Sequence, residues 1–185
     1  MKFRKTPLGV NYLYDYYPVN WKEHGEDSQA ILRFKDGYET EIERFAYEIK
    51  EALINKAGND ISIFEGAKVI LVPSHRYGEW SESLLRVAQV ICKELGMDNR
   101  SRALVRTTNH AKLSTGGERS VESHLRTIEL KRAYAISGEF KGQRVLILDD
   151  ITTTGNSIRA CAQILRKAGV LEVEAVTIGQ TARRT

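Results

Sequence analysis

Hydrophobic residues recur every three or four positions in three separate parts of the chain, residues 42–53, 84–95 and 158–168. Charged and polar residues occupy most of the positions between them. This spacing places the apolar side chains on one face of an α-helix. A glycine follows each run within a few residues, as is common just beyond a helix C-terminus. The pattern therefore predicts three amphipathic helices.

Short, mostly apolar runs lie between and after these helices. They cover residues 68–72, 103–106, 134–136, 145–148 and 173–178. Apolar runs of this length are typical of strands in a parallel sheet, which is buried on both faces. Strands that alternate with helices indicate βαβ units with right-handed crossovers. We therefore predict an α/β fold in which helices cover both faces of a parallel sheet.

The first 38 residues form a less regular segment. It holds an aromatic-rich stretch that fits neither helical nor strand spacing cleanly, with Tyr12, Tyr14, Tyr16, Tyr17, Pro18 and Trp21. These side chains either cover an edge of the core or wall a pocket for a planar molecule by stacking. We expect one domain over residues 1–185, with residues 1–38 as a small irregular N-terminal hood and residues 39–180 as the core.

Composition limits the class of protein. The chain has 185 residues, of which 42% are hydrophobic and 28% charged, as in a soluble globular domain. No apolar run approaches the roughly 20 residues of a membrane span, and the N-terminus lacks the apolar core of a signal peptide. The sequence therefore predicts a cytoplasmic protein without a membrane partner. Cys92 and Cys161 fall on apolar faces of predicted helices, which indicates buried free thiols.

The charge balance points to a small anionic ligand. The formal net charge is +4 and the pI is about 9.0. Lysine and arginine are spread through the chain and mixed with acids, whereas nucleic-acid-binding proteins usually carry a dense basic stripe. The charge permits nucleic acid or a small polyanion, which explains the modest basic excess equally well, and we do not expect nucleic acid as the direct ligand.

Polar segments follow three of the predicted strands. They cover residues 73–80, 107–119 and 149–157, and ligands of parallel sheets bind beyond the carboxyl ends of the strands. In the last segment two adjacent acids, Asp149 and Asp150, end the apolar run. A hydroxyl-rich turn then leads into a helix, whose N-terminus favours phosphate. The pattern predicts a site for a phosphorylated ligand that carries hydroxyl groups.

A long polar segment, residues 107–126, interrupts the alternation of strands and helices. Loops of this length in compact domains are usually lids or binding segments. We expect it to close over the ligand. His110 and His124 are isolated histidines in this polar segment, and we do not predict an acid or base role for either.

The run from Val145 to Ser157 resembles the phosphoribosyl pyrophosphate (PRPP) signature of type I phosphoribosyltransferases, in which an apolar strand, an acidic pair and T-T-G-x-[ST] follow one another. Residues 30–180 are similar to the ComF-like, competence-associated branch of this family. The similarity includes Arg33–Gly37, which resembles its F/L-K-Y-x-G entry, and Val72–Arg76, which resembles its V-P-x-H/R loop. The typical cysteine-rich zinc module is missing here, and residues 109–112 replace the T-x-x-Q of the long loop.

The resemblance implies a Rossmann-like phosphoribosyltransferase core and a role for each part of the site. The turn would bind the 5′-phosphate of PRPP through Thr153, Thr154, Gly155, Asn156 and Ser157. Asp149 and Asp150 would accept hydrogen bonds from the ribose hydroxyls, and Mg²⁺ would arrive with PRPP. The pyrophosphate would bind Ser74, His75 and Arg76. Arg106, Lys112 and Arg119 would close over the pyrophosphate. There are alternatives: Lys112 and Arg119 could instead be solvated charges of a polar loop, and His75 could simply cap a turn.

Two functions follow from the resemblance. The first is Mg²⁺-dependent transfer of the 5-phosphoribosyl group to an unidentified acceptor, with release of pyrophosphate. The second is a PRPP- or nucleotide-binding regulatory or accessory protein without turnover, for example in DNA uptake or defence. Nucleobase-salvage relatives often carry an acid at the position of Thr153, and a threonine cannot act as a general base near pH 7, which argues against ordinary purine salvage. Enzymes of this type commonly pair, so a homodimer is expected.

Overall fold

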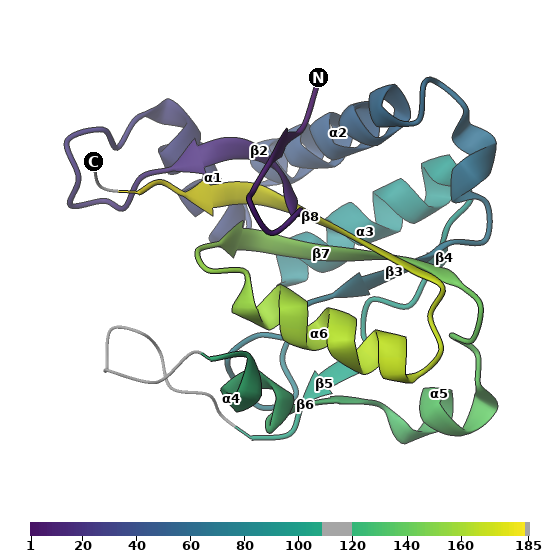
Figure 1. The fold of residues 1–185 in the computed structure, drawn as a ribbon. Helices are drawn as coiled ribbons and strands as arrows, with labels where there is room; N and C mark the ends of the chain where they lie inside the picture. The colour runs from purple at the N-terminus through teal and green to yellow at the C-terminus, as the bar shows by residue number, and fades with distance from the viewer. Residues whose placement is uncertain (109–119, 184–185) are drawn as a thin grey trace.

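A computed structural model describes residues 1–108 and 120–183. Its main sheet has, within these residues, six strands in the order β1-β2-β8-β7-β3-β4 (Figure 1). The strands are β1 (Arg4–Lys5), β2 (Asn11–Tyr16), β3 (Lys68–Leu71), β4 (Asp98–Asn99), β7 (Arg144–Thr152) and β8 (Glu172–Thr181). Only β1 runs antiparallel to its neighbour. The predicted α/β fold with a mainly parallel sheet is confirmed.

Helices cover both faces of this sheet, as predicted (Figure 1). One face carries α1 (Glu26–Lys35), α2 (Glu39–Lys56) and α3 (Glu82–Leu95), and the other carries α6 (Asn156–Lys167). Smaller elements lie beyond α6 or in the connections: α4 (Val121–Leu125), α5 (Arg132–Ser137), the 3₁₀ helix η1 (Ile61–Phe64), and a small sheet of β5 (Leu104–Arg106) and β6 (Ile128–Leu130).

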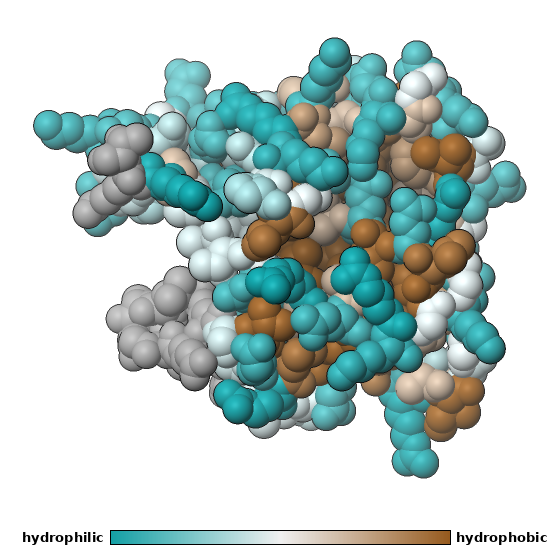
Figure 2. All heavy atoms as spheres, in the orientation of Figure 1, coloured by the Kyte–Doolittle hydropathy of each residue, from teal (hydrophilic) through white to brown (hydrophobic). Residues whose placement is uncertain are grey.

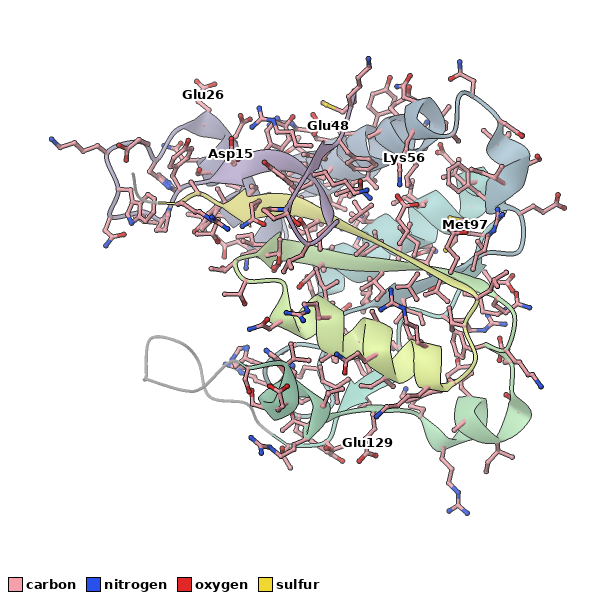
Figure 3. All side chains as sticks on the ribbon, viewed as in Figure 1. Asp15, Glu26, Glu48, Lys56, Met97 and Glu129 are labelled. Carbon is pink, nitrogen blue, oxygen red and sulfur yellow. The ribbon has the colours of Figure 1, made fainter. Side chains whose placement is uncertain are left out.

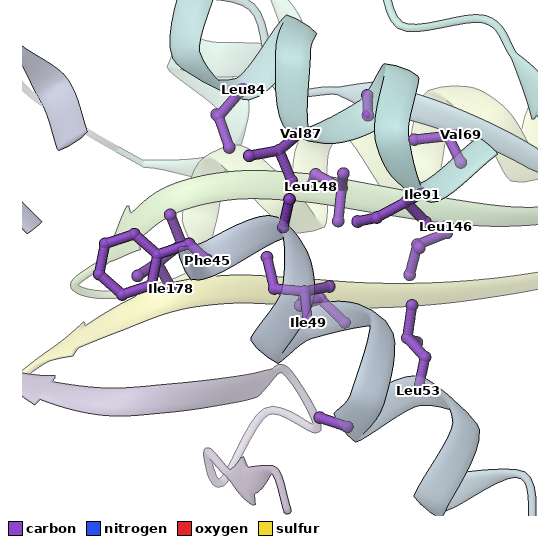
Figure 4. Packing of buried hydrophobic residues seen from close by; sticks show 14 of the residues in the cluster. Phe45, Ile49, Leu53, Val69, Leu84, Val87, Ile91, Leu146, Leu148 and Ile178 are labelled. Carbon is purple, nitrogen blue, oxygen red and sulfur yellow. The ribbon is translucent and has the colours of Figure 1, made fainter. Parts of the chain in front are cut away.

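The alternation of side chains along β7 explains the two apolar layers. Leu146 and Leu148 point into a cluster with α2 and α3 (Figure 4). Val145 and Ile147 point to the other face, where they pack with α6. Successive side chains of a strand face opposite sides, so a continuous apolar run requires cover on both. Packing on both faces holds the strands of the sheet in position, and so positions the strand ends as well.

The three predicted amphipathic helices correspond to α2, α3 and α6. The hydroxyl of Ser81 accepts a hydrogen bond from the Leu84 N–H at 3.3 Å and caps α3, and Gly96 ends this helix with a φ of 66°. These are the usual devices at helix ends. Cys92 on α3 and Cys161 on α6 are buried and free, as expected.

The N-terminal segment is more regular than predicted. β2 pairs in parallel with β8, and α1 follows, so residues 1–38 extend the main sheet and do not form an irregular hood. Tyr12, Tyr14 and Tyr16 stand two residues apart, which is strand spacing, and aromatic residues favour strands. Tyr14 packs edge-on against Phe45 and donates a hydrogen bond to Glu48 on α2, labelled in Figure 3. Tyr14 therefore covers the core edge, the first of the two alternatives.

Three further expectations need correction. Residues 134–136 belong to helix α5 and not to a strand. Leu104–Arg106 forms a strand as predicted, but it pairs antiparallel with β6 in a separate two-stranded sheet and not with the main sheet. The acidic pair does not end its strand, because β7 continues to Thr152 with Asp149 opposite Thr177 of β8.

Polar residues are spread over the face of the molecule seen in Figure 2, with apolar residues between them, and form no single stripe. Glu26 and Glu129 point outward at opposite edges of the molecule (Figure 3). Among the helices that the structure describes, none has the length and apolar character needed to cross a membrane.

Candidate ligand-binding cleft

A cleft of about 620 Å³ lies at the carboxyl ends of β3 and β7. Its wall combines the segment after β3, the acidic pair of β7, and the end of α1. The lining residues that matter below are Lys35, Ser74, His75, Trp80, Arg106, His124, Asp149, Asp150 and Ser157. Two of the three polar segments predicted at strand ends therefore converge in one cleft. The third lies mostly outside the described residues.

The acidic pair is held by the backbone of β7. Asp149 Oδ1 accepts a hydrogen bond from the Asp150 N–H at 3.0 Å, and Asp150 Oδ1 accepts one from the Ile151 N–H at 2.5 Å. Both side chains are half-buried and line the cleft. Because the two residues are part of a paired strand, the carboxylates are presented on a rigid support.

Lys35 forms an ion pair with this acidic pair, which sequence reasoning missed. Its Nζ lies 2.9 Å from Asp150 Oδ2. The lysine is the last residue of α1, and the N–H of Gly37, which has a φ of 86°, bonds to the Phe34 carbonyl. Arg33–Gly37 was part of the family resemblance, but the residues of this motif did not predict the ion pair between Lys35 and Asp150. The packing of α1 against β2 and α2 places Lys35 at the cleft.

The charges in the cleft shift two pKa values. Burial, and then the negative charge of Asp150, raise the pKa of Asp149 well above its usual range, although Lys35 and Arg106 oppose the rise. Burial alone would lower the pKa of Lys35, but the charge and hydrogen bond of Asp150 outweigh it, so this pKa is raised. Lys35 thus stays protonated, while Asp149 ionises less readily than a solvated aspartate.

The turn after β7 bends at a glycine with a positive φ. Gly155 has a φ of 73°, and a Cβ there would lie 3.3 Å from Leu8 Cδ1. No side chain caps α6 among the described residues. Thr152 is 3% exposed, and its Oγ1 has no hydrogen-bond partner in that part of the chain. Backbone N–H groups at the start of α6 and a buried hydroxyl beside them fit an anion.

The turn is also tied to β8. Thr153 Oγ1 shares a hydrogen bond of 2.8 Å with Thr181 Oγ1, and Gln180 Nε2 donates to the Thr153 carbonyl at 3.1 Å. The Thr153 side chain therefore contacts β8. Ser157 lines the cleft, whereas Thr153, Thr154, Gly155 and Asn156 are not among its lining residues.

The loop after β3 is held in place by a buried arginine. Arg106 is 2% exposed, and its Nε donates a hydrogen bond to the Ser74 carbonyl at 2.5 Å. Its Nη1 donates to Thr127 Oγ1 at 2.6 Å. Ser74 Oγ in turn accepts from the Arg76 N–H at 3.1 Å. Arg106 is thus a fixed part of the cleft wall, not a side chain that closes over it as expected.

The remaining predicted residues divide into three groups. Ser74 and His75 line the cleft. Arg76 is exposed, makes a loose ion pair with Glu79 at 3.8 Å, and is not among the lining residues. Lys112 and Arg119 lie outside the described residues.

Two further lining residues had no predicted role. His124 is buried on α4, where Ser120 Oγ caps the helix by accepting from the Ser123 N–H at 3.1 Å. Trp80 Nε1 donates to the Leu104 carbonyl at 3.0 Å. The available signal for His124 was Ser120, because a helix-capping residue inside a polar segment indicates that a helix begins there.

The chemistry of the donor groups fits Mg²⁺ only with help from a ligand. Carboxylate oxygens are hard donors of the kind that Mg²⁺ prefers. Within residues 1–108 and 120–183, no group of three or more histidine, cysteine or acidic side chains could hold a metal ion by itself. Asp149 and Asp150 could supply two such oxygens, and the other donors would have to come from a ligand.

Comparison with known proteins identifies the family. The phosphoribosyl transferase domain family matches residues 84–185, more than half of the chain. Competence protein F of Haemophilus influenzae is 25% identical over 153 residues, which cover 80% of this chain and 65% of that protein. Orotate phosphoribosyltransferase of Methanocorpusculum labreanum is 45% identical over 47 residues, 25% of this chain and 28% of that enzyme. The chain thus spans about two thirds of the competence protein's length.

Solved structures of similar proteins include two phosphoribosyltransferases. A hypoxanthine phosphoribosyltransferase from Staphylococcus aureus has a TM-score of 0.41 and 13% identity, and the match covers 78% of this chain and 68% of that one. A purine phosphoribosyltransferase from Pyrococcus horikoshii has a TM-score of 0.40 and 13% identity, with 94% and 83% covered. On the strength of the domain match and the PRPP signature, the chain belongs to the phosphoribosyltransferase family, as a ComF-like member of type I.

Proposed function

We propose that this cleft binds PRPP, and that the protein transfers its 5-phosphoribosyl group to an acceptor with release of pyrophosphate. The observation that carries the proposal is that the acidic pair of β7 lies in the same cleft as Ser74, His75 and Ser157. PRPP needs these features together, because it carries two phosphate-bearing ends and a ribose with free hydroxyls. A generic phosphate site would need only one of them.

The turn and the start of α6 would bind the 5′-phosphate. Gly155 lets the backbone turn with a positive φ, so that the first N–H groups of α6 can point to the anion. The buried hydroxyl of Thr152 would gain a hydrogen-bond partner there. The positive end of the helix dipole adds to the attraction.

Asp149 and Asp150 would accept hydrogen bonds from the ribose hydroxyls. As the bond to pyrophosphate breaks, positive charge develops on the ribosyl ring, and ionised carboxylates nearby stabilise it. Burial and the charge of Asp150 raise the pKa of Asp149 and so make its ionisation less favourable in the free protein. A ligand that brings positive charge, or hydroxyl donors, to this carboxylate relieves that cost, which favours binding of the reacting species.

The Ser74–Arg76 loop would bind the pyrophosphate, with the positive charge of Arg106 behind it. The loop needs little ordering on binding, because Arg106 already holds the Ser74 carbonyl. Mg²⁺ bound with PRPP would neutralise pyrophosphate charge and make it a better leaving group. In the long segment, Lys112 and Arg119 stay proposed as cations that close over the ligand and exclude water.

A specific observation favours the second function, PRPP binding without turnover. The Thr153 hydroxyl is bonded to Thr181, and its carbonyl accepts from Gln180, so this residue holds the turn and offers no base to a nucleobase acceptor. The protein would then act through a partner, as an accessory or regulatory protein. A homodimer and a cytoplasmic location also stay predictions, and light scattering after gel filtration tests the first.

Two measurements test the proposal. Titration calorimetry with Mg-PRPP is expected to give saturable binding that the double substitution Asp149→Asn/Asp150→Asn removes. Pyrophosphate release is then measured across a panel of nucleobases and small nitrogen nucleophiles. Release with one acceptor class supports transfer. Intact binding without release across the panel supports the accessory function, and no binding at millimolar PRPP contradicts both.

A further inference from the structure

The ion pair between Lys35 and Asp150 places a lysine ammonium in the cleft. Lys35 Nζ lies 2.9 Å from Asp150 Oδ2, and the other oxygen of Asp150 accepts the Ile151 N–H. The side chains of Lys35 and Asp150 keep 38% and 22% of their surface exposed. The ammonium therefore faces both the carboxylate and the space in which a ligand would lie.

The end of α1 is fixed, so the position of Lys35 is part of the fold. Ser83 Oγ, in the first turn of α3, donates a hydrogen bond of 2.6 Å to the Phe34 carbonyl. This bond ties the last turn of α1 to the start of α3. The lysine stem has four carbons and can redirect its ammonium by a few ångströms while its Cα stays in place.

The two cations of the cleft differ in their freedom. Arg106 is buried and committed to the Ser74 carbonyl and the Thr127 hydroxyl. Lys35 is held by a carboxylate at a partly solvated surface, where an ion pair is weak. A second anion that enters the cleft can therefore share the ammonium of Lys35 without the loss of buried contacts.

A pyrophosphate placed near two carboxylates meets like-charge repulsion. Here Asp149 and Asp150 together carry up to two negative charges, and Lys35 already offsets one of them. Lys35 therefore lies where a cation between the carboxylates and the pyrophosphate would reduce the repulsion between them.

We propose that Lys35 supplies part of the positive charge that Mg²⁺ would otherwise supply to the pyrophosphate of the ligand, so that PRPP binding in this cleft depends less on the metal ion. This inference rests on the proposed function, since it presumes that PRPP enters the cleft. It assigns to Lys35 a ligand-binding role that the signature residues do not include.

The test measures PRPP binding by calorimetry with Mg²⁺ and with EDTA. Wild type, Lys35→Met and Lys35→Arg are compared. The matched control is Lys50→Met, because Lys50 forms a pair of the same 2.9 Å length with Glu94 on the helices, outside the cleft lining. Thermal melts check that each variant is folded. Lys35→Arg keeps the positive charge, so it still allows a comparison with wild type if Lys35→Met unfolds.

The expected result is a loss that depends on the metal. In EDTA, Lys35→Met should weaken PRPP binding about 10- to 100-fold, as for a hydrogen bond to a charged group. With Mg²⁺ the loss should be several-fold smaller, and Lys35→Arg and Lys50→Met should behave like wild type. Ribose 5-phosphate, which lacks pyrophosphate, should bind Lys35→Met and wild type alike.

Two results would overturn the inference. The first is an equal loss in Lys35→Met with and without Mg²⁺, which would make the lysine an ordinary contact. The second is an equal loss for ribose 5-phosphate, which would make it a structural support for Asp150. Failure of the proposed function is separate, because wild type would then fail to bind Mg-PRPP at all.

Discussion

Arg106 Nε donates a hydrogen bond to the Ser74 carbonyl at 2.5 Å, so a fully buried arginine shapes the loop that the ligand would meet. The same side chain reaches Thr127, on the connection between α4 and β6. One residue of β5 thus joins the loop after β3 to the elements that follow the long polar segment. The cleft wall is built from parts of the chain that are distant in sequence.

Replacement of Arg106 should destabilise the fold and weaken ligand binding. Arg106→Met leaves the Ser74 carbonyl and the Thr127 hydroxyl without this donor, and a buried polar group left unpaired costs about 1–3 kcal/mol. We expect the free energy of unfolding to fall by about 2–4 kcal/mol in urea titrations. Arg106→Lys keeps the charge but cannot reach both acceptors, so its free energy of unfolding should lie between those of wild type and Arg106→Met. A change below about 0.5 kcal/mol in Arg106→Met would contradict this role.

Asp149→Asn should stabilise the protein at neutral pH while it removes PRPP binding. The pKa of Asp149 is higher in the folded protein than in the unfolded chain, where it is about 4. Ionisation of Asp149 therefore lowers the stability of the fold, and this loss develops as the pH rises from the unfolded-state pKa through the folded-state pKa. The amide avoids this cost. Differential scanning fluorimetry at pH 7 should therefore give a higher Tm than wild type, and the difference should shrink toward pH 4.

Asp150→Asn is the matched control for that prediction. It relieves the repulsion on Asp149 but also removes the ion-pair partner of Lys35, so its gain in Tm should be smaller than that of Asp149→Asn. If Asp149→Asn lowers the Tm at pH 7, the electrostatic description of the pair is wrong.

Gly155→Ala should weaken PRPP binding more than its effect on stability explains. The positive φ disfavours alanine by about 1–2 kcal/mol, and the new Cβ would press on Leu8. Gly142→Ala is the control, since Gly142 also has a positive φ, 72°, but precedes the start of β7, at the other end of the strand from the turn. Both variants should lose stability in urea, Gly155→Ala somewhat more because of the contact with Leu8, but only Gly155→Ala should lose affinity in calorimetry. Equal affinities would argue against phosphate binding at this turn.

Both cysteine thiols should be unreactive in the folded protein. Burial raises the pKa of Cys92 to about 12 and also raises that of Cys161, so neither forms a thiolate near neutral pH. Ellman's reagent at pH 8 should react slowly with native protein and quickly with both thiols in guanidinium chloride. Rapid reaction of one thiol in the native protein would show that its helix opens locally.

The sequence pattern predicted the parts of the fold that depend on local periodicity. The apolar run 145–148 indicated a strand covered on both sides, and the three- and four-residue spacing around Phe45 and Ile91 indicated helices. These elements follow from side-chain period alone. β2 was missed because Tyr17, Pro18 and Trp21 obscured the two-residue spacing of the tyrosines before them.

The candidate site was predictable only where its residues follow one another in the chain. Asp149, Asp150 and Ser157 belong to a contiguous motif, and the cleft brings them together with Ser74 and His75. Lys35 could not be predicted, because its contact with Asp150 depends on how α1 packs beside the sheet. The end of the strand also depended on tertiary structure: pairing with β8 carries β7 through the acids to Thr152.

The most direct test of the account is calorimetric titration of the protein with Mg-PRPP, beside the double variant Asp149→Asn/Asp150→Asn and the control Gly142→Ala. We predict saturable binding by wild type and by the control, and loss of binding in the double variant although it remains folded. Binding of equal strength in all three proteins, or no binding by wild type at millimolar PRPP, would contradict the assignment of this cleft.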